Sequence, residues 1–445
     1  MLARSQLRII IVASLAGLLF GFDTAVISGV TQDLRSAFSL TPAGLGIAVS
    51  TALWGTLFGA LTMGRPGDQF GSREVLKFIG LLYLAAALGC ALAWNLPAFL
   101  VCRFLIGVAI GGSSVLAPVY IAEASPAARR GALVGLFQIN IVIGILLAYI
   151  SNFMVAQLLA GPEVWRCKLA IAAIPALVFL LLLFFIPQSP RWLIHRGRYA
   201  EAAAALKRLG SAGPAADIEA IRAAESPAPS GKAGLSWRRH GRLIVLAIGM
   251  GMFNQLSGIN AILYYLGDIF GAAGFSSLSA NLQSIVIGAT NLLATIVAMT
   301  LIDRTGRKRL LLIGSVGMAL AQGGVAAIMA LNSGRALLLP LLVVFIASFA
   351  ISQGAVIWVY LSEIFPTPVR ARGQSLGSAT HWIMNALISA LFPAIAALST
   401  SIPFVFFSLM MLLQFLLVLW FLPETKGVAL ERMGSAMAAC DRSND

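Results

Sequence analysis

The sequence predicts an all-α membrane protein of twelve transmembrane helices in two pseudo-symmetric six-helix bundles. The first observation behind this prediction is composition. The chain is 59% hydrophobic and 11% charged, with a mean hydropathy of +0.91, which excludes an ordinary soluble globular protein. The second observation is an internal repeat, because the same charged hinges return about 240 residues later between apolar stretches.

The repeated hinges are short charged motifs that lie between apolar stretches. Asp68-Gln-Phe-Gly71 returns as Asp303-Arg-Thr-Gly306. A second motif, Glu-x-x-Pro followed by arginines, occurs in each half as Glu123 with Arg129 and Arg130, and as Glu363 with Arg370 and Arg372. Repeats of this length between membrane spans are typical of secondary transporters, in which two similar bundles move around a site at their interface.

The spans themselves follow from hydropathy, since a transmembrane helix needs about 20 mostly apolar residues. Twelve stretches meet this length, at residues 9–30, 43–63, 75–94, 97–121, 132–157, 168–186, 242–267, 280–302, 310–331, 336–361, 374–397 and 401–422. The predicted domains are an N-terminal bundle, a cytoplasmic linker, a C-terminal bundle and a cytoplasmic tail, at 1–186, 187–241, 242–422 and 423–445. We expect one or two small surface helices in the linker, from the helical pattern around Glu201.

Orientation follows from the basic residues. If alternate loops share one side, that side holds all but five of the 31 Lys and Arg; the exceptions are Arg35, Arg166, Lys168 and Arg335 on the other side and Arg103 inside a span. The positive-inside rule then places both termini and the charged hinges in the cytoplasm of a multi-pass cell-membrane protein, whether inner or plasma membrane.

The sequence lacks the motifs that are typical of other functional classes. No Gly-Lys-Ser/Thr phosphate loop occurs, which excludes an ATP-driven pump within this chain. The four cysteines lack metal-binding spacing, and no catalytic arrangement of Ser, His and Asp is evident. The net charge of +14 lies in the loops, so it indicates topology rather than nucleic-acid binding. We therefore expect no enzyme activity, cofactor or metal.

Glycines recur four residues apart in several spans, as in Gly17/Gly21, Gly55/Gly59 and Gly107/Gly111. This spacing predicts close helix–helix packing.

Two full charges lie well inside the predicted spans, Asp23 in the first and Arg103 in the fourth. Asp23 lies about 8 residues from the outer end of its helix, or ~12 Å, and Arg103 lies about 6 residues past Pro97, or ~9 Å. Their similar depth permits an ion pair. Arg103 would stabilise the ionised carboxylate and desolvation the protonated one, so protonation of Asp23 could make or break the pair. The alternative is a static ion pair that ties two helices together.

Polar side chains also interrupt the apolar helices and suggest the solute. They are Gln138, Asn254, Gln255, Asn260, His381 and Asn385, accompanied by the aromatic residues Tyr264, Trp358 and Trp382. Amides offer both donors and acceptors to a ring of hydroxyls, and flat aromatics offer a platform to a sugar's C–H face. A site without further embedded charge favours a neutral solute over phosphate esters, amino acids or organic acids. An intramembrane amide that only joins helices is the alternative.

Six motifs in register resemble the sugar porter family of the major facilitator superfamily. They are Gly21 to Gly29, Arg103 to Tyr120, Pro187 to Trp192, Gln255 to Asn260, Asp303 to Lys308 and Pro423 to Gly427. The resemblance covers essentially the whole chain and implies the major facilitator fold. It also implies transport of a monosaccharide or similar polyol, and Asp23 stands where bacterial proton-coupled symporters carry an aspartate.

The resemblance assigns roles to individual residues. It implies that Gln138, Gln255, Asn260, Trp358 and Asn385 are the main sugar contacts. It also implies a cytoplasmic gate, in which helix-end charges latch that side while the outside is open; these are Asp68, Arg73, Glu123, Arg129, Arg130, Asp303, Arg307, Glu363 and Arg370. Solvated charges that only fix topology would explain their sign but not their repetition.

Several positions depart from the family pattern, among them Arg65, Pro66 and Ser72 in the first hinge. Asn254 stands where many members have a second glutamine, and His381 where asparagine or glutamine is expected. Gln188 replaces the usual glutamate of Pro-Glu-Ser-Pro-Arg and so removes a charge from the cytoplasmic network.

The sequence thus favours a proton-coupled monosaccharide symporter in which Asp23 accepts the proton. A passive sugar facilitator of the same fold is the main alternative, and a membrane sugar sensor is a further one. The expected partners are the sugar, the proton and the lipid bilayer, without nucleic acid, and the expected state is a monomer.

Overall fold

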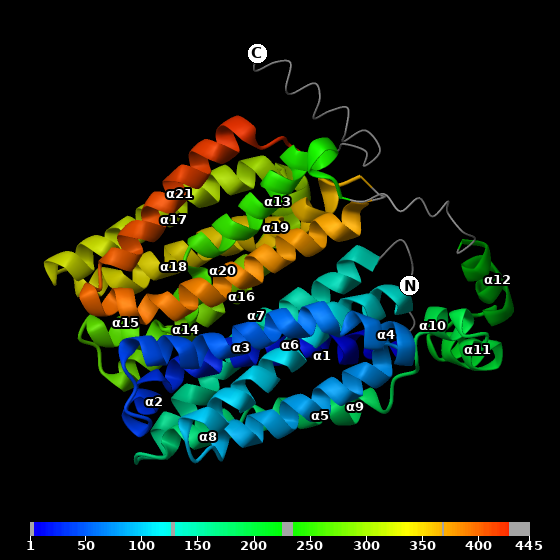
Figure 1. The fold of residues 1–445 in the computed structure, drawn as a ribbon, viewed down its shortest axis with the longest axis horizontal. Coiled ribbons are helices and arrows are strands. Elements are labelled where there is room, and N and C mark those ends of the chain that lie inside the picture. The colour runs from blue at the N-terminus through cyan, green and yellow to red at the C-terminus, as the bar shows by residue number, and fades with distance from the viewer. Residues whose placement is uncertain (1–3, 126–129, 225–234, 367–368, 427–445) are drawn as a thin grey trace. The chain divides into compact units, whose positions relative to one another are not determined.

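A computed structural model describes residues 4–125, 130–224, 235–366 and 369–426 (Figure 1). The described residues form helices and connecting turns, without a β-strand. Contacts divide the chain into two compact units, Met1–Ser39 with Thr51–Ser230, and Leu40–Ser50 with Gly231–Asp445.

The first half of the chain contains six membrane-spanning segments joined by short helices; five belong to the first unit, and the second in order, α3, is divided at Ser50 between the two units. The spanning helices are α1 (Arg4–Val26) with η1 (Ile27–Gly29), α3 (Pro42–Thr62), α5 (Ser72–Ala91), α6 (Leu96–Ala124), α7 (Arg130–Leu158), and α8 (Val164–Ala170) with α9 (Ala173–Leu183). The short helices are α2 (Thr31–Ala37) and α4 (Gly64–Phe70).

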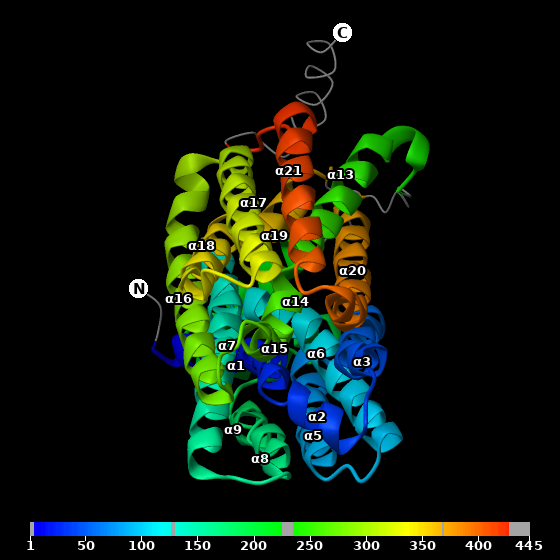
Figure 2. The same cartoon turned by 90° about the vertical axis from the view of Figure 1, so that its left-hand side faces the viewer.

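The second unit repeats this plan. Its spanning helices are α13 (Trp237–Leu256) with α14 (Ile259–Tyr264), α16 (Ser277–Thr305), α17 (Arg307–Leu331), α18 (Leu338–Phe349) with α19 (Ala355–Glu363), α20 (Arg370–Leu398) and α21 (Ile402–Phe421). The short elements are α15 (Leu266–Ala272) and η3 (Arg335–Leu337). Both views show α17 beside α21 (Figures 1 and 2).

Twelve helical segments of the described chain are long and apolar enough to span a membrane, which confirms the predicted number. Their ends fall within a few residues of those predicted; the first, for example, is Gln6–Gly29 instead of 9–30. Hydropathy locates spans well because the bilayer core fixes both the length and the polarity of a helix that crosses it.

Glycines permit the close packing that their spacing predicts. A Cβ atom at Gly107 on α6 would overlap the backbone carbonyl of Ala52 on α3 and the Cα atom of Gly55. Because backbone atoms cannot rotate away as a side chain can, the two helices approach this closely only through glycine.

Several spans depart from the continuous helices that hydropathy predicts. The sixth is interrupted at Ile171 and Ala172, between α8 and α9. The seventh span is interrupted at Ser257 and Gly258, between α13 and α14. Gly258 has a positive φ of 78°, and a Cβ atom there would overlap the ring of Phe407. The tenth span contains a π-helical turn, η4 (Ala350–Gly354), between α18 and α19. Broken backbone inside a membrane is tolerated only where other protein groups satisfy it.

Two basic residues of the predicted outer side bind carbonyl groups at helix ends. Arg166 donates to the carbonyls of Ala91 and Ala93 at the end of α5, at 2.8 and 2.7 Å. Lys168, which is buried, donates to the carbonyl of Gly29 at 2.6 Å. Cations are favourable at helix C-termini, where carbonyls lack helical partners.

The segment after the sixth span forms three short helices rather than the one or two expected. They are α10 (Pro190–His195), α11 (Tyr199–Arg208) and α12 (Pro214–Ala224). They form a small cluster in Figure 1 and share an apolar core of Leu193, Ile194, Ala202, Ala205, Leu206 and Ile218.

We predict that Gly107→Val prevents close packing of α3 and α6. Overpacking costs about 1–3 kcal/mol where neighbours can adjust, and the carbonyl of Ala52 cannot, so the loss should reach or exceed the top of that range. Thermal unfolding of the purified protein in detergent measures this loss. Gly249→Val on α13 is the matched control, because no atom lies within 4 Å of its added Cβ. Equal melting temperatures for the two variants would contradict the packing argument.

Candidate functional site

Asp23 and Arg103 form an ion pair inside the first unit. The Arg103 Nη1 atom lies 2.6 Å from the Asp23 Oδ1 atom. Both residues are buried, with 5% and 2% of their surfaces exposed, and they join α1 to α6. The geometry therefore fits the pairing expected from their depths in the two helices.

The pair leaves part of the guanidinium unsatisfied. The Arg103 Nε atom is buried and has no hydrogen-bond partner. Tyr83 is buried nearby, but its hydroxyl donates to the carbonyl of Leu19, at 3.4 Å. A buried ion pair is stable only when attraction and further hydrogen bonds offset desolvation. An incompletely satisfied pair of this kind can separate when the carboxylate takes up a proton.

Four of the predicted sugar-contact residues form one hydrogen-bonded cluster in the second unit. Asn260 Nδ2 donates to Gln255 Oε1 at 3.0 Å, and Gln255 Nε2 donates to Asn254 Oδ1 at 3.0 Å. The same Gln255 amide group faces the ring nitrogens of His381, at 3.2 and 3.3 Å. The break between α13 and α14 places these amides together, because Asn260 lies just beyond the turn at Gly258.

Two tryptophans lie beside this cluster. The Trp358 ring centroid lies 5.2 Å from that of His381, and the Trp382 ring meets the same imidazole edge to face at 5.1 Å. Trp358 is 41% exposed and Trp382 is buried. The exposed indole offers a flat apolar surface next to hydrogen-bonding amides, an arrangement that suits a sugar ring.

The structure gives the following for the other predicted contacts. Asn385 Nδ2 donates to the Tyr264 hydroxyl at 3.5 Å, and Ser389 Oγ donates to Asn385 Oδ1 at 3.2 Å. Gln138 is a half-buried residue of α7 in the first unit.

Buried amides that the sequence analysis did not select extend the cluster. Asn254 Nδ2 faces both the backbone carbonyl and the Oε1 atom of Gln353, at 3.4 Å each. Gln353 Nε2 donates to Gln414 Oε1, and Gln414 Nε2 donates to Ser315 Oγ at 2.8 Å. Gln353 and Gln414 interrupt apolar runs just as Gln255 does, so the same criterion applied to every span would have found them.

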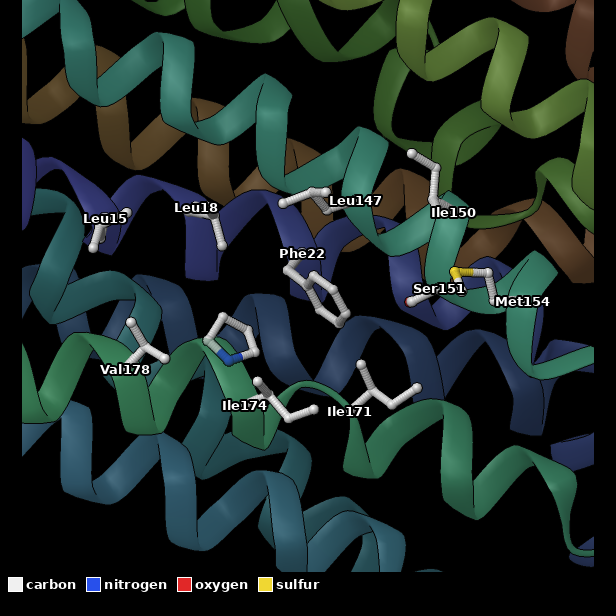
Figure 3. Close-up of a pocket in the computed structure, with 11 residues that line it drawn as sticks. Leu15, Leu18, Phe22, Leu147, Ile150, Ser151, Met154, Ile171, Ile174 and Val178 are labelled. Carbon is white, nitrogen blue, oxygen red and sulfur yellow. The ribbon is translucent and has the colours of Figure 1, made fainter. Parts of the chain in front are cut away.

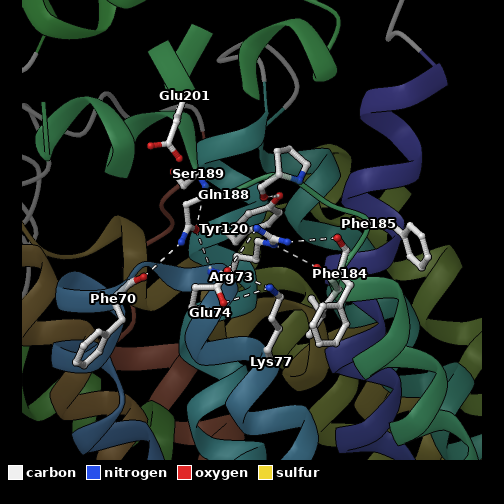
Figure 4. Close-up of polar contacts among 12 residues, drawn as sticks. Phe70, Arg73, Glu74, Lys77, Tyr120, Phe184, Phe185, Gln188, Ser189 and Glu201 are labelled. Carbon is white, nitrogen blue, oxygen red and sulfur yellow. Dashed lines mark hydrogen bonds and ion pairs between the residues drawn. The ribbon is translucent and has the colours of Figure 1, made fainter. Parts of the chain in front are cut away.

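At the expected cytoplasmic end of the first unit, Gln188 caps helix α5 (Figure 4). Its Oε1 atom accepts from the backbone N–H of Arg73 at 3.3 Å, and its Nε2 atom donates to the carbonyl of Phe70 at 3.3 Å. The Arg73 side chain donates to the carbonyls of Leu183 and Phe184, at 3.2 Å each. An amide thus joins α4, α5 and the segment after α9.

Glu424 has the equivalent place in the second unit. Its two carboxylate oxygens accept from the backbone N–H groups of Arg307 and Lys308, at 2.9 and 3.1 Å. Arg307 also pairs with Glu363 at 2.8 Å, and Thr425 Oγ1 donates to the same carboxylate at 2.6 Å. The repeat therefore has a charged cap in one unit and a neutral cap in the other.

The remaining predicted gate residues differ in their exposure and in their hydrogen-bond partners. The Asp68 residue is exposed, and its backbone carbonyl accepts from Trp192 and Arg196, at 2.9 and 3.3 Å. The Glu123 carboxylate is half-buried near Ser189, and its Oε2 atom has no hydrogen-bond partner. Arg370 Nε donates to the carbonyl of Phe365 at 3.2 Å. Arg129 and the side chains of Arg130 and Asp303 lie outside the described residues.

A pocket of about 420 Å³ lies elsewhere in the first unit, among α1, α7 and α9 (Figure 3). Its lining is apolar apart from Ser151, whose hydroxyl donates within its own helix to the carbonyl of Ala148, at 2.8 Å. With one hydroxyl oxygen as the only side-chain polar group in its lining, the pocket does not suit a polyol. It is suited to apolar chains such as those of lipids.

Comparison with known proteins decides the family. The family model described as "Sugar (and other) transporter" matches residues 9–436. The chain belongs to this family, the sugar porters of the major facilitator superfamily.

Named relatives align with this chain over nearly their whole length. This sugar porter is 33% identical to the D-xylose-proton symporter of Escherichia coli (strain K12), over 96% of this chain and 94% of the relative. It is 35% identical to the glucose transporter GlcP of Staphylococcus epidermidis (strain ATCC 12228 / FDA PCI 1200), over 96% of both. These relatives are transporters rather than enzymes, as predicted.

Solved structures confirm the fold. The xylose transporter XylE from E. coli, in a partially occluded inward open conformation, matches with a TM-score of 0.84 and 33% identity, over 96% of this chain and 100% of that chain. Its inward open structure matches with a TM-score of 0.85 and 32% identity, over 96% and 98%. This sugar porter is therefore a multi-pass membrane transporter with the major facilitator fold.

We predict that Arg103→Leu strongly destabilises the protein, because it leaves the Asp23 carboxylate buried and unpaired. Removing one partner of a buried pair costs about 3–5 kcal/mol. The double variant Asp23→Asn/Arg103→Leu should recover much of the stability, since it leaves no buried charge. Thermal unfolding in detergent measures all three proteins. Additive losses in the double variant would show that the two side chains are not coupled.

We predict that the cap formed by Glu424 depends on salt and the cap formed by Gln188 does not. Glu424→Gln should cost about 0.3–1 kcal/mol at low ionic strength, because a carboxylate at a helix N-terminus gains from the helix dipole. That loss should shrink in 1 M salt, where the Debye length is about 3 Å. Gln188→Ala is the control and should cost the same at both salt concentrations. A salt-independent loss in Glu424→Gln would refute the electrostatic role.

Proposed function

We propose that this sugar porter imports a neutral monosaccharide, a hexose or a pentose, together with a proton by alternating access. Asp23 accepts the proton and Arg103 is its partner. The buried Asp23–Arg103 pair is the observation that carries this proposal. Intramembrane carboxylates are costly in hydrocarbon and commonly mark proton pathways. The similarity to a D-xylose-proton symporter supports it.

The proposed cycle depends on the ion pair. With Asp23 ionised, Arg103 ties α6 to α1. Proton uptake removes the attraction and leaves a neutral carboxylic acid, so the two helices are free to rearrange. Coupling arises if the sugar favours the protonated arrangement, because a ligand shifts a conformational equilibrium only by its differential affinity.

The proposed sugar contacts are the amide and aromatic residues of the second unit together with Gln138. Asn254, Gln255, Asn260 and Asn385 offer donors and acceptors to hydroxyl groups. Trp358 offers an apolar surface, with Tyr264, His381 and Trp382 around it. The absence of ionised side chains among these residues favours a neutral solute.

We also propose the cell membrane as location, with both termini in the cytoplasm, from the distribution of basic residues. The helix-end contacts around Arg73, Glu123, Arg307 and Glu363 then form a cytoplasmic gate. Contacts of this kind are individually weak, which suits a gate that must open in every cycle.

A passive facilitator is the second candidate, since the ion pair joins α1 and α6 whether or not it releases a proton. The two functions differ in one respect: only a symporter accumulates sugar against its own gradient.

We predict gradient-driven accumulation of at least one of glucose, galactose, xylose and arabinose in proteoliposomes with an inward proton gradient. For one proton per sugar, a difference of one pH unit limits accumulation to about tenfold, because one pH unit is equivalent to 1.36 kcal/mol. Asp23→Asn should abolish accumulation and retain sugar exchange, since an amide cannot take up the proton.

Asp33→Asn is the control, because Asp33 is a partly exposed carboxylate of the same unit and should leave accumulation intact. Equal final sugar levels with and without the gradient would favour the facilitator. Accumulation that survives in Asp23→Asn would remove Asp23 from the coupling mechanism.

A further inference from the structure

Five amide side chains of the second unit form a single chain of hydrogen bonds that all run in the same direction. Asn260 donates to Gln255, Gln255 to Asn254, Asn254 to Gln353, and Gln353 to Gln414. Gln414 then donates to Ser315, and Ser315 Oγ donates to the backbone carbonyl of Leu311 at 2.7 Å. The chain runs from α14 through α13 and η4 to α21 and α17.

Two fixed acceptors determine this direction. An amide side chain can in principle turn over and exchange its donor for its acceptor. Asn254, however, faces the backbone carbonyl of Gln353, which can only accept, so its NH₂ group must point there. At the far end, the Ser315 hydroxyl donates its only proton to the carbonyl of Leu311, so its oxygen can only accept from Gln414. Every amide in between is thereby oriented.

The π-helical turn η4 brings about the central contact. Gln353 lies in Ala350–Gly354, where it presents both its backbone carbonyl and its side chain to Asn254. π-Helical turns are rare and are frequently found at functional sites. Gln353 is 1% exposed and Gln414 3% exposed, so neither is accessible to a solute.

The open end of the chain has a defined polarity. Asn260 is half-buried, whereas Asn254, Gln255, Gln353 and Gln414 are buried. Because one N–H of Asn260 donates to Gln255, the Asn260 carbonyl oxygen is left to accept from a ligand, beside one remaining N–H of the same amide. Aligned hydrogen bonds in a low-dielectric interior also polarise one another, which strengthens that acceptor.

We propose that Gln353 and Gln414 are positioning residues for sugar selectivity, acting through Asn254 and Gln255 to hold the Asn260 oxygen as an acceptor. A sugar hydroxyl that meets this oxygen must then donate its proton. The inference rests on the proposed function, because it specifies how the proposed sugar site selects its ligand.

The test uses sugar analogues in which one hydroxyl is replaced by hydrogen or by fluorine. Neither substituent can donate a proton, and fluorine retains only a weak ability to accept. Affinities are measured as inhibition of labelled-sugar exchange in proteoliposomes, for the transported sugar and its deoxy and deoxyfluoro series. In the natural protein we expect one ring position at which both replacements weaken binding equally, by about two- to tenfold, the range of one hydrogen bond.

Gln353→Met and Gln414→Met replace an amide by an apolar side chain of similar size. Gln353→Met removes the Oε1 acceptor of Asn254, and Gln414→Met removes the partner that orients it. Asn254 then keeps only the backbone carbonyl of Gln353, at 3.4 Å, so the amides on the ligand side are less strongly oriented and Asn260 presents its NH₂ group more often. We expect KM for the parent sugar to rise with little change in kcat. At the sensitive position, the fluoro analogue should bind better relative to the deoxy analogue than it does in the natural protein.

Gln283→Met is the matched control. Gln283 is a half-buried amide of α16 in the same unit that donates to Ser279 Oγ of its own helix, at 3.1 Å, and lies outside the chain. It should leave the fluoro-to-deoxy ratio unchanged even if it lowers stability. Ser315→Ala, which removes the terminal anchor, tests the same idea if one glutamine variant fails to fold.

The outcomes separate the two proposals. A natural protein that exchanges none of the sugars would overturn the proposed function. Exchange by the natural protein with the same fluoro-to-deoxy ratio in Gln353→Met, Gln414→Met and Gln283→Met would overturn only the role of the amide chain. The role is also overturned if no ring position shows equal losses for the two analogues. A ratio that changes in the chain variants and not in Gln283→Met supports it.

Discussion

The structure depends on one constraint, which is that polar groups within hydrocarbon must find their partners inside the protein. In the first unit Asp23 and Arg103 meet it with an ion pair between α1 and α6, and in the second unit the buried amides meet it by forming a connected series. The two solutions suit different tasks. An ion pair changes state when one proton binds, whereas a series of neutral amides holds its geometry over a wide range of pH. Proton coupling and sugar selectivity can therefore reside in different units of the same repeat.

The two halves of the repeat share backbone geometry at their hinges but differ in the side chains that cap the helices. Gly71 and Gly306, at the starts of α5 and α17, have positive φ angles of 87° and 94°, and each is approached by the side chain that caps the next helix. That side chain is the neutral Gln188 in one case and the charged Glu424 in the other. Backbone geometry tolerates either cap because both offer an oxygen to the free N–H groups of a helix start. The chemistry of the helix ends can therefore change in one half without changing the fold.

Much of the fold could be predicted from the sequence, because span length and charge distribution are averages over many residues. The contact between Asp23 and Arg103 could be predicted as well, since depth in two adjacent helices leaves few other partners. The break at Gly258 and the π-helical turn at Gln353 could not, because both spans read as continuously apolar and the irregular backbone depends on tertiary packing against residues such as Phe407. Four residues predicted to contact the sugar contact one another in the structure; they are Asn254, Gln255, Asn260 and His381. No repeat or motif in the sequence indicated Gln353 and Gln414.

Arg166 and Lys168 have a consequence for how the chain enters the membrane. In the proposed orientation both cations must cross the bilayer. Arg166 has an ion-pair partner in Glu163, three residues before it, whereas the partners of Lys168, the carbonyl of Gly29 and the carboxylate of Asp33, belong to an earlier part of the chain. The nascent sixth span therefore carries the unpaired charge of Lys168 towards the outside, against the usual bias of insertion. Earlier helices that are already in place would supply the missing ligands. Insertion of this span and assembly of the first unit are thus expected to be a single step rather than two successive ones.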